Sequence, residues 1–327
     1  MRALQVTSLD GPEAVEPADL PEPEADHMFS PGQGVVVEVA AAAVSFPDVL
    51  QSRGLYQFKP DPPFVPGAEV AGVVHSASDG AAVSPGDRVA AFTGLSGWAE
   101  LAVAPPHMTF PLPESLDFAQ GAALILNYHT AYFSLKLRGR LAEGERVLVH
   151  GAAGGVGTAT LQVAKGLGAG TVAVVSSEEK ERVAREAGAD EVVRSDGPWR
   201  EQVQELGGVD VVVDPVGGDR FTDSLRCLNE EGRVVVVGFT EGSIPEVRVN
   251  RLLLRNVDVV GAGWGAYVMP KPHVTREVAE AIDRLIDEGA VRPVVGARFP
   301  LARGADAMRL IDERQATGKI VLDVPGD

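Results

Sequence analysis

Residues Gly151-Ala-Ala-Gly-Gly-Val-Gly157 place four glycines in seven positions. This stretch directly follows the apolar run RVLVH and opens the helix-patterned stretch VGTATLQVAKGLGA. A helix start presents unpaired amides and a partial positive charge, and glycine lets a phosphate approach them closely. A strand, such a turn and a helix form the context of a dinucleotide-binding motif. We therefore expect the turn to contact a cofactor through Ala153, Gly154, Gly155, Val156 and Gly157.

The alternative is a glycine-rich turn without a ligand, because the spacing departs from GxGxxG. The surrounding pattern favours the cofactor. Helix-like stretches alternate with the runs RVLVH, TVAVV, DEVV, VDVVVD and RVVVVGF. Such valine-rich runs are typical of parallel strands in a sheet covered on both faces. The sequence thus predicts an α/β fold with a Rossmann doubly wound parallel sheet over residues 123–269.

The first third of the chain has a different rhythm. Its short runs GVVVEVAAAAV, EVAGVVHSA and DRVAAF are separated by turn signals, which predicts a mostly β domain over residues 1–122. Residues 270–327 are expected to return to that domain. They contain a helical stretch, TREVAEAIDRLIDEGA, and the closing run GKIVLDV. The apolar positions on one face of that helix are Val278, Ala281, Ile282, Leu285 and Ile286.

Charge and composition exclude several classes of protein. The chain has 29 basic and 46 acidic residues and a net charge of −17, which disfavours nucleic acid and anionic membranes as partners. No run approaches the roughly 20 apolar residues of a membrane span, and the start lacks the apolar region of a signal peptide. We therefore expect a cytoplasmic protein. Cys227 is the only cysteine, which excludes a multi-cysteine zinc site, and it is expected to be a buried small hydrophobe.

The choice of cofactor depends on the end of the next strand, TVAVV. NAD-binding proteins carry a carboxylate there for the ribose hydroxyls. This chain has Ser176 and Ser177, with Lys180 just beyond, which favours the extra phosphate of NADPH. Two alternatives remain. Ser176 and Glu179 match a helix capping box, and Lys180 is equally consistent with a solvated helix residue.

Several longer stretches resemble one family. They are SFPDVLQSRGLY, PFVPGAEVAGVV, PGDRVAAF, NYHTAYFSL, VLVHGAAGGVGTATLQVAK, EEKERVAREAGADEV, VDVVVDPVGG and GKIVL. Together they resemble the zinc-free quinone oxidoreductase (zeta-crystallin-like) branch of the medium-chain dehydrogenase/reductase superfamily. The resemblance covers nearly the whole chain. It implies a GroES-like catalytic domain built from both chain ends, an inserted Rossmann NADP-binding domain, an active site in the cleft between them, and a homodimer.

The resemblance also bears on metal binding. Relatives with catalytic zinc carry a histidine where this chain has Ala68 and a cysteine near the position of Phe46. The six histidines show no ligand spacing, so we expect no metal. Without a Lewis acid, alcohol dehydrogenation is disfavoured. Hydride transfer from NADPH to a small-molecule quinone or α,β-unsaturated carbonyl is the expected reaction.

The resemblance implies roles for individual residues. Tyr56 matches the tyrosine after Arg-Gly-x and is the expected catalytic residue, donating to the substrate oxygen or orienting the nicotinamide; the alternative is a packed loop aromatic. Ser45 replaces the asparagine common in these reductases and is expected near the nicotinamide ribose. Thr130 is expected at the nicotinamide end, with packing as the alternative. The other expected cofactor contacts follow strand ends, with ordinary loop hydrophobes as the alternative: Val216, Phe239 and Trp264.

Three questions stay open on sequence alone. Arg194 could reach the adenosine phosphate, although a solvated arginine is the simpler interpretation. An enoyl-thioester reductase of the same superfamily is the nearest enzymatic alternative. A NADPH-binding protein with negligible turnover is the alternative from another class, and the asparagine-to-serine difference at position 45 keeps it open.

Overall fold

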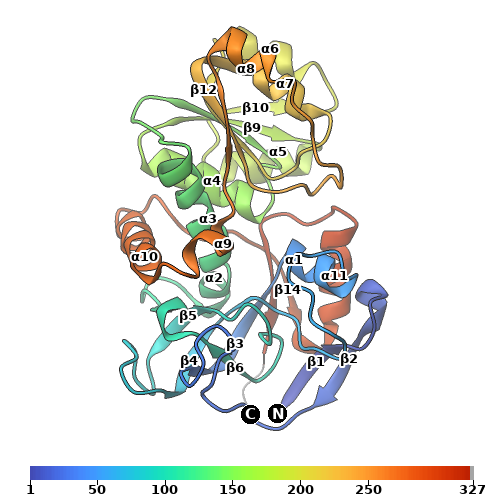
Figure 1. The fold of residues 1–327 in the computed structure, drawn as a ribbon, viewed down its shortest axis with the longest axis vertical. Coiled ribbons are helices and arrows are strands. Elements are labelled where there is room, and N and C mark those ends of the chain that lie inside the picture. Colours follow the sequence, from blue (N-terminus) through green and yellow to red (C-terminus); the bar gives the residue numbers. More distant parts are fainter. Residues whose placement is uncertain (325–327) are drawn as a thin grey trace. The chain divides into compact units, whose positions relative to one another are not determined.

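The protein is described by a computed structural model in which residues 1–324 are placed. The chain divides into two compact units. The first, here the β-rich unit, comprises residues 1–126, 271–279 and the chain from 293 onward. The second, here the Rossmann unit, comprises residues 127–270 and 280–292. The β-rich unit therefore joins elements from the two ends of the sequence, blue to cyan and red in Figure 1.

The β-rich unit is built on a seven-stranded sheet with the order β14-β15-β3-β4-β5-β7, in which β6 also pairs with β3. Separately, β1 and β2 form a two-stranded sheet. The strands are β1 (Arg2–Val6), β2 (Val15–Asp19), β3 (Val35–Val44), β4 (Glu69–Ala77), β5 (Arg88–Phe92), β6 (Leu101–Ala104), β7 (Thr109–Pro111), β14 (Val295–Pro300) and β15 (Lys319–Asp323). β15 runs antiparallel to β3, with Ile320 opposite Val44. This pairing brings the start of β15 to the end of β3.

Short helices complete this unit: α1 (Phe46–Ser52), α2 (Phe118–Ala122) and α11 (Gly304–Asp312), with 3-10 turns at Gly11–Ala14, Pro106–Met108 and Leu301–Arg303. α1 begins directly after β3, with Ser45 as its N-cap and proline in its first turn. Proline is tolerated there because the first amides of a helix have no partner within it. The β3–α1 junction thus fixes the backbone at Ser45.

The Rossmann unit contains a six-stranded parallel sheet in the order β10-β9-β8-β11-β12-β13. Its strands are β8 (Arg146–His150), β9 (Gly170–Val175), β10 (Glu191–Arg194), β11 (Val209–Asp214), β12 (Leu228–Val236) and β13 (Asp258–Gly261). The central positions of β8 and β11 are fully buried, as expected for valine-rich strands covered on both faces. The sequence prediction of a parallel α/β sheet is confirmed.

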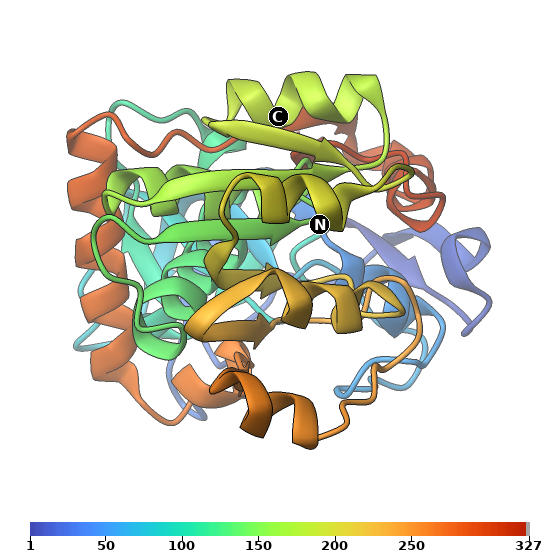
Figure 2. The same ribbon diagram turned by 90° about the horizontal axis from the view of Figure 1, so that it is seen from above.

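Helices connect these strands: α4 (Gly155–Gly166), α5 (Glu178–Glu186), α6 (Trp199–Glu205), α7 (Arg220–Cys227), α8 (Asn250–Arg255) and α9 (Trp264–Val268). α4 contacts α5, and α6 contacts α7. Because β–α–β crossovers are right-handed and the strand order reverses at β8, the two pairs cover opposite faces of the sheet (Figure 2). α3 (Thr130–Tyr132) lies between two π-helical turns, Ile125–His129 and Phe133–Arg138.

The structure also resolves several finer expectations. The predicted apolar face of α10 (Pro272–Asp287) is buried at all five positions. Cys227 is buried at the end of α7, and burial raises the pKa of its thiol to about 12. α4 ends at Gly166, and Leu167 is its C-cap. No helix within residues 1–324 combines the length and apolar character needed to cross a bilayer.

The sequence predicts domain boundaries at 1–122, 123–269 and 270–327. The division into compact units does not test these boundaries, so they stay a prediction. One boundary between the units lies within α10. The second half of this helix and the turn after it, residues 280–292, group with the Rossmann unit. A continuous helix carries no composition change that would signal such a division.

Candidate functional site

The carboxyl ends of the parallel strands meet at one edge of the Rossmann sheet, where open α/β sheets bind ligands. β8 ends immediately before the glycine turn, and β9 ends immediately before Ser176. β11 and β12 end shortly before Val216 and Phe239. The predicted cofactor residues of this unit therefore lie along one edge, with the exception of Thr130, which belongs to α3.

The glycine turn leaves the start of α4 open. Gly154 is the N-cap, and a Cβ added there would meet only Gly151 O, 3.4 Å away, among the described residues. Gly157 is tightly packed, since a Cβ there would lie 2.2 Å from Gly151 O. Gly151 itself adopts φ +58°, which favours glycine. Gly151 thus allows the turn, Gly157 allows close packing behind it, and Gly154 leaves room at the helix N-cap, where a phosphate could approach.

Val216 lies close to this turn, and Phe239 lies beside the neighbouring Gly217. A Cβ at Gly151 would come within 3.2 Å of Val216 Cγ2, and a Cβ at Gly217 within 3.1 Å of Phe239. Asp214 fixes the loop between them and β11, because its Oδ1 accepts hydrogen bonds from the amides of Val216 and Gly217, both at 2.9 Å. The loop after β11 therefore borders the phosphate turn.

Ser176 lies between two cationic side chains. Lys180 Nζ donates to Ser176 Oγ at 3.3 Å, and Arg194 Nη2 donates to the Ser176 carbonyl at 3.3 Å. Arg194 also pairs with Asp196 at 3.1 Å and its side chain is 37% exposed, so its contact with a cofactor phosphate stays a prediction. Parallel pairing of β9 with β10 places Arg194 opposite the last residue of β9. Both cations therefore gather at the end of β9.

The alternative of a capping box at Ser176 and Glu179 is wrong. The N-cap of α5 is Ser177, whose Oγ accepts a hydrogen bond from Lys180 N at 3.2 Å. Adjacent serines are equally good caps, so the sequence alone could not separate them. The Ser176 hydroxyl therefore does not cap α5. It lies at the end of β9 and accepts the hydrogen bond from Lys180.

Thr130 and Trp264 are packed inside the Rossmann unit. Their exposed fractions are 6% and 3%. The indole of Trp264 meets the ring of His129 edge-on, with the ring centroids 6.0 Å apart. Burial lowers the pKa of His129 to about 3, so this imidazole is neutral. These contacts support the packing interpretation of both residues, and their contact with a cofactor stays a prediction.

A buried polar cluster in the β-rich unit surrounds Lys319, the first residue of β15. Lys319 Nζ donates to Ser45 Oγ at 2.7 Å and pairs with Glu69 Oε1 at 3.0 Å. Asp48 accepts hydrogen bonds from Ser45 N at 2.7 Å and Gly67 N at 3.1 Å. Burial nevertheless raises the pKa of the Asp48 carboxyl to about 6, and it also raises the pKa of Glu69. We call Ser45, Asp48, Glu69 and Lys319 the Lys319 cluster.

Tyr56 follows α1 and is half-buried. Burial raises the pKa of its phenol, and the nearby charge of Asp48 raises it further. The phenol therefore keeps its proton and can donate a hydrogen bond at neutral pH. The sequence pointed to Ser45 and Tyr56 but missed the role of Lys319, because only the pairing of β15 with β3 brings positions 45 and 319 together.

The two positions tied to catalytic zinc in relatives hold no ligating side chain. Phe46 is the first residue of α1, and Ala68 is buried beside Glu69. Within residues 1–324, no group of three or more histidine, cysteine, aspartate or glutamate side chains is arranged to hold a metal ion. The Lys319 cluster beside these positions offers one hydroxyl, two carboxylates and an ammonium.

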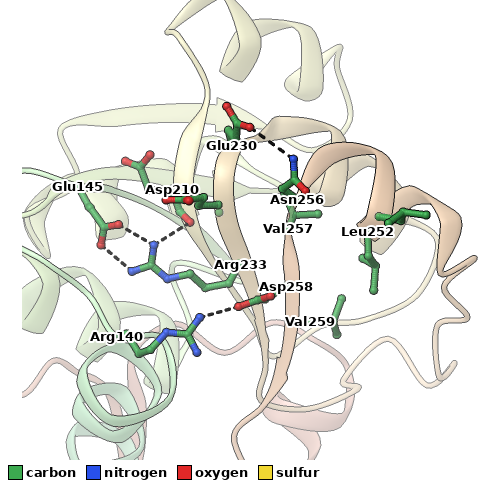
Figure 3. Close-up of a pocket in the computed structure, with 13 residues that line it drawn as sticks. Arg140, Glu145, Asp210, Glu230, Arg233, Leu252, Asn256, Val257, Asp258 and Val259 are labelled. Carbon is green, nitrogen blue, oxygen red and sulfur yellow. Dashed lines mark hydrogen bonds and ion pairs between the residues drawn. The ribbon is translucent and has the colours of Figure 1, made fainter.

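A groove of about 950 Å³ lies at the opposite, amino-terminal edge of the Rossmann sheet (Figure 3). Its cations are paired: Arg233 makes two 2.6 Å hydrogen bonds to Glu145, and Arg140 meets Asp258 at 2.6 Å. The lining also contains Asp210, Glu230 and Glu231. This excess of carboxylates is unsuited to a polyanionic cofactor.

Comparisons with known proteins agree with this architecture. Residues 31–114 match the family model described as alcohol dehydrogenase GroES-like domain, and residues 155–285 match zinc-binding dehydrogenase. Quinone oxidoreductase-like protein 2 of Bos taurus is 39% identical over 297 residues, which cover 89% of this chain and 85% of the relative. This chain belongs to the quinone oxidoreductase-like branch of the medium-chain dehydrogenase/reductase superfamily.

Solved structures of the superfamily match over nearly the full length. A probable oxidoreductase from Mycobacterium abscessus superposes with a TM-score of 0.88 at 41% identity and covers 99% of each chain. The quinone oxidoreductase from Thermus thermophilus, solved alone and in complex with NADPH, gives 0.84 at 35% identity, covering 99% of this chain and 100% of its own. These matches show that this quinone oxidoreductase-like chain has the same fold, a GroES-like domain with a Rossmann domain.

Proposed function

We propose that this chain is a cytoplasmic, zinc-independent, NADPH-dependent oxidoreductase that transfers hydride to a quinone or an α,β-unsaturated carbonyl. The observation that carries the proposal is the pairing of an open helix start at Gly154 with two cations at Ser176, on one edge of the parallel sheet. The NADPH complex of the Thermus thermophilus relative supports the same cofactor here.

The residues on this edge fit NADPH. The start of α4 would hold the pyrophosphate, since the first amides of a helix have no partner within it and, among the described residues, no side chain crowds the Cβ position of Gly154. Ser176, Lys180 and Arg194 would hold the phosphate that distinguishes NADPH from NADH. Bound NADPH supplies the hydride, and the protein supplies orientation and electrostatics. Val216 and Phe239 would border the bound cofactor, as proposed contacts beside the glycine turn.

The residues of the β-rich unit support the reduction of an electron-poor acceptor. Tyr56 keeps its proton and can donate to an oxygen on which negative charge develops. Ser45 offers a second hydroxyl within the Lys319 cluster. The zinc-associated positions hold Phe46 and Ala68, which supports a reaction without a Lewis acid.

The phosphate site predicts a selective effect of Lys180→Ala. NADPH binding should weaken about tenfold, or about 1.4 kcal/mol, because a charge-assisted hydrogen bond to the phosphate is lost. NADH binding should hardly change, since NADH lacks that phosphate. Fluorescence titration of both cofactors measures the difference.

Arg182→Ala is the matched control for this titration. Arg182 lies on the same helix and pairs with Glu186 at 2.6 Å, with both side chains more than half exposed. It should leave both affinities unchanged. Equal weakening of NADPH and NADH by Lys180→Ala would remove Lys180 from the phosphate site.

The proposed reaction is tested by following NADPH oxidation with a quinone, an enone and an enoyl thioester, before and after dialysis against a chelator. We expect turnover with the quinone or enone, no loss after chelation, and little turnover with NADH. Reduction of the enoyl thioester alone would establish the alternative reductase. NADPH binding without turnover of any acceptor would establish a cofactor-binding protein instead.

Tyr56→Phe adds a residue-level arm to the same assay. The variant should reduce turnover about tenfold while NADPH affinity stays unchanged, because the phenol acts only as charge develops in the transition state. The enone should lose more than the quinone, since its enolate depends more on a proton donor. Unchanged turnover with both acceptors would make Tyr56 a packing residue.

We further propose that the chain forms a homodimer through the β13 edge of the Rossmann sheet. β13 is the last strand at that edge, and an unpaired strand edge is usually covered or paired. α8 precedes it and exposes Leu253 and Leu254, each 76% accessible, with Val249 73% accessible before them. Such a patch beside an open edge is suited to a second copy of the same surface.

Light scattering at micromolar concentration should give twice the 34.3 kDa of one chain. The double variant Leu253→Asp/Leu254→Asp should shift the mass to that of one chain, because it places charge in an apolar interface. Leu55→Asp is the control, since Leu55 is 67% exposed and lies in the β-rich unit. A single-chain mass for the wild type would refute the dimer.

A further inference from the structure

Ser45 and Lys319 form a directed hydrogen bond inside the β-rich unit. An ammonium can only donate, so Ser45 Oγ accepts the 2.7 Å bond from Lys319 Nζ. Both residues are nearly inaccessible, at 6% and 4%. The Ser45 amide is already committed to Asp48 at 2.7 Å. The remaining hydrogen-bonding capacity of Ser45 is its own O–H, which donates to no acceptor among residues 1–324.

The lysine is held in place by a second contact on its other side. Glu69 Oε1 lies 3.0 Å from Lys319 Nζ, and Glu69 is 1% exposed. The groups that face this lysine are thus Ser45 from the start of α1, Glu69 from β4, and the charge of Asp48 from α1. Tyr56 lies within the influence of Asp48. Ser45 is the neutral partner of this buried ammonium and Glu69 the charged one. Once Ser45 has given up its own proton, its alkoxide is a far stronger base than the Glu69 carboxylate, so the lysine proton moves to Ser45.

The residue type at position 45 decides what can happen beside Lys319, as a comparison of serine with asparagine shows. An amide can orient a ligand, but it does not give up its proton and take another. A hydroxyl can do both in one step. The combination of a serine with a buried lysine directly behind it therefore adds a capacity for proton transfer that an asparagine would not supply.

We propose that Lys319 and Ser45 form a proton relay to the oxygen of the acceptor, with Ser45 as the donor and Lys319 as the positioning and recharging residue. The inference rests on the proposed function. An enone that gains hydride at its β-carbon moves its π electrons onto oxygen. That oxygen forms a bond to the Ser45 proton as the Ser45 O–H bond breaks. Lys319 then transfers one N–H proton to Ser45 Oγ, and solvent later restores the proton to Lys319.

Glu69 contributes to the reset of this relay. When Lys319 gives up its proton, the Glu69 carboxylate loses its ion-pair partner in a buried setting, which is costly. Proton uptake by Lys319 restores the pair. The cluster thus favours a short-lived neutral lysine over a persistent one, as a relay requires.

Substitutions at Ser45 test the donor directly. Ser45→Ala should lower enone turnover about a hundredfold, at the low end of general acid catalysis, with NADPH affinity unchanged. Ser45→Thr keeps a hydroxyl and should recover most of that loss. Ser52→Ala is the matched control, because Ser52 is a buried serine of the same helix whose hydroxyl donates to Val49 O at 2.8 Å. It should leave turnover unchanged.

The lysine is tested without creating an unpaired buried charge. The double variant Lys319→Met/Glu69→Gln removes both charges of the ion pair and keeps the side-chain lengths. It should lower enone turnover as far as Ser45→Ala does. Adding Ser45→Ala to it should cause no further loss, because both changes interrupt one path. If the loss caused by Ser45→Ala instead multiplies the loss of the double variant, the two changes act independently and the relay is wrong.

A binding measurement gives a readout apart from turnover. 4-Nitrophenol resembles the charged product oxygen, and its absorbance distinguishes phenol from phenolate. The wild type should bind the phenolate about tenfold more tightly relative to the phenol than Ser45→Ala does, equal to one pKa unit of the bound phenol. The same ratio in both proteins would overturn the role of Ser45 as donor.

The outcomes separate this inference from the proposed function. If the wild type reduces an enone and Ser45→Ala matches it, the relay is wrong and the proposed function stands. If Ser45→Ala lowers NADPH affinity together with turnover, Ser45 positions the cofactor and the relay is also wrong. If the wild type binds NADPH and reduces no acceptor, the proposed function fails and the relay fails with it.

Discussion

Gly157 has no room for a side chain. The arrangement of the carboxyl-terminal edge of the Rossmann sheet depends on this constraint. A Cβ there would lie 2.2 Å from Gly151 O, so any larger residue would force the turn between β8 and α4 to move. With glycine present, the turn packs closely, and the Cβ position of Gly154 at the start of α4 stays uncrowded. The loop after β11 and the cations at Ser176 then lie along the same edge, because the parallel strands end there together. A local packing requirement thus shapes the turn at which we propose that the cofactor phosphates bind.

A second constraint acts in the β-rich unit. β15 pairs with β3, and this pairing buries Lys319 against Ser45 and Glu69. Burying a charge is costly unless it is paired. The register of β15 therefore matters, because it brings Lys319 to its ion-pair partner Glu69. A shift of one residue would turn the lysine to the other face of the sheet. The final strand therefore contributes the buried ammonium of the Lys319 cluster as well as sheet structure.

The sequence predicts the fold class and the family well, and it predicts the site only in part. Valine-rich runs and helical spacing are local signals, and the parallel sheet they indicate is present. The choice between Ser176 and Ser177 as a helix cap depends on one backbone turn, which adjacent identical residues cannot reveal. Lys319 is 274 residues from Ser45, so no spacing rule could connect them. Thr130 and Trp264 read equally well as packing or as ligand contacts, and their burial favours packing.

The central claim is direct hydride transfer from NADPH to an electron-poor carbon without a metal. It is tested most directly with NADPH that carries deuterium at the transferable position of nicotinamide C4, an enone acceptor, and protein dialysed against a chelator. Mass spectrometry and NMR of the product should locate one deuterium at the former β-carbon. A reduced product without deuterium at that carbon, or a reaction that proceeds only after zinc is restored, would contradict the account.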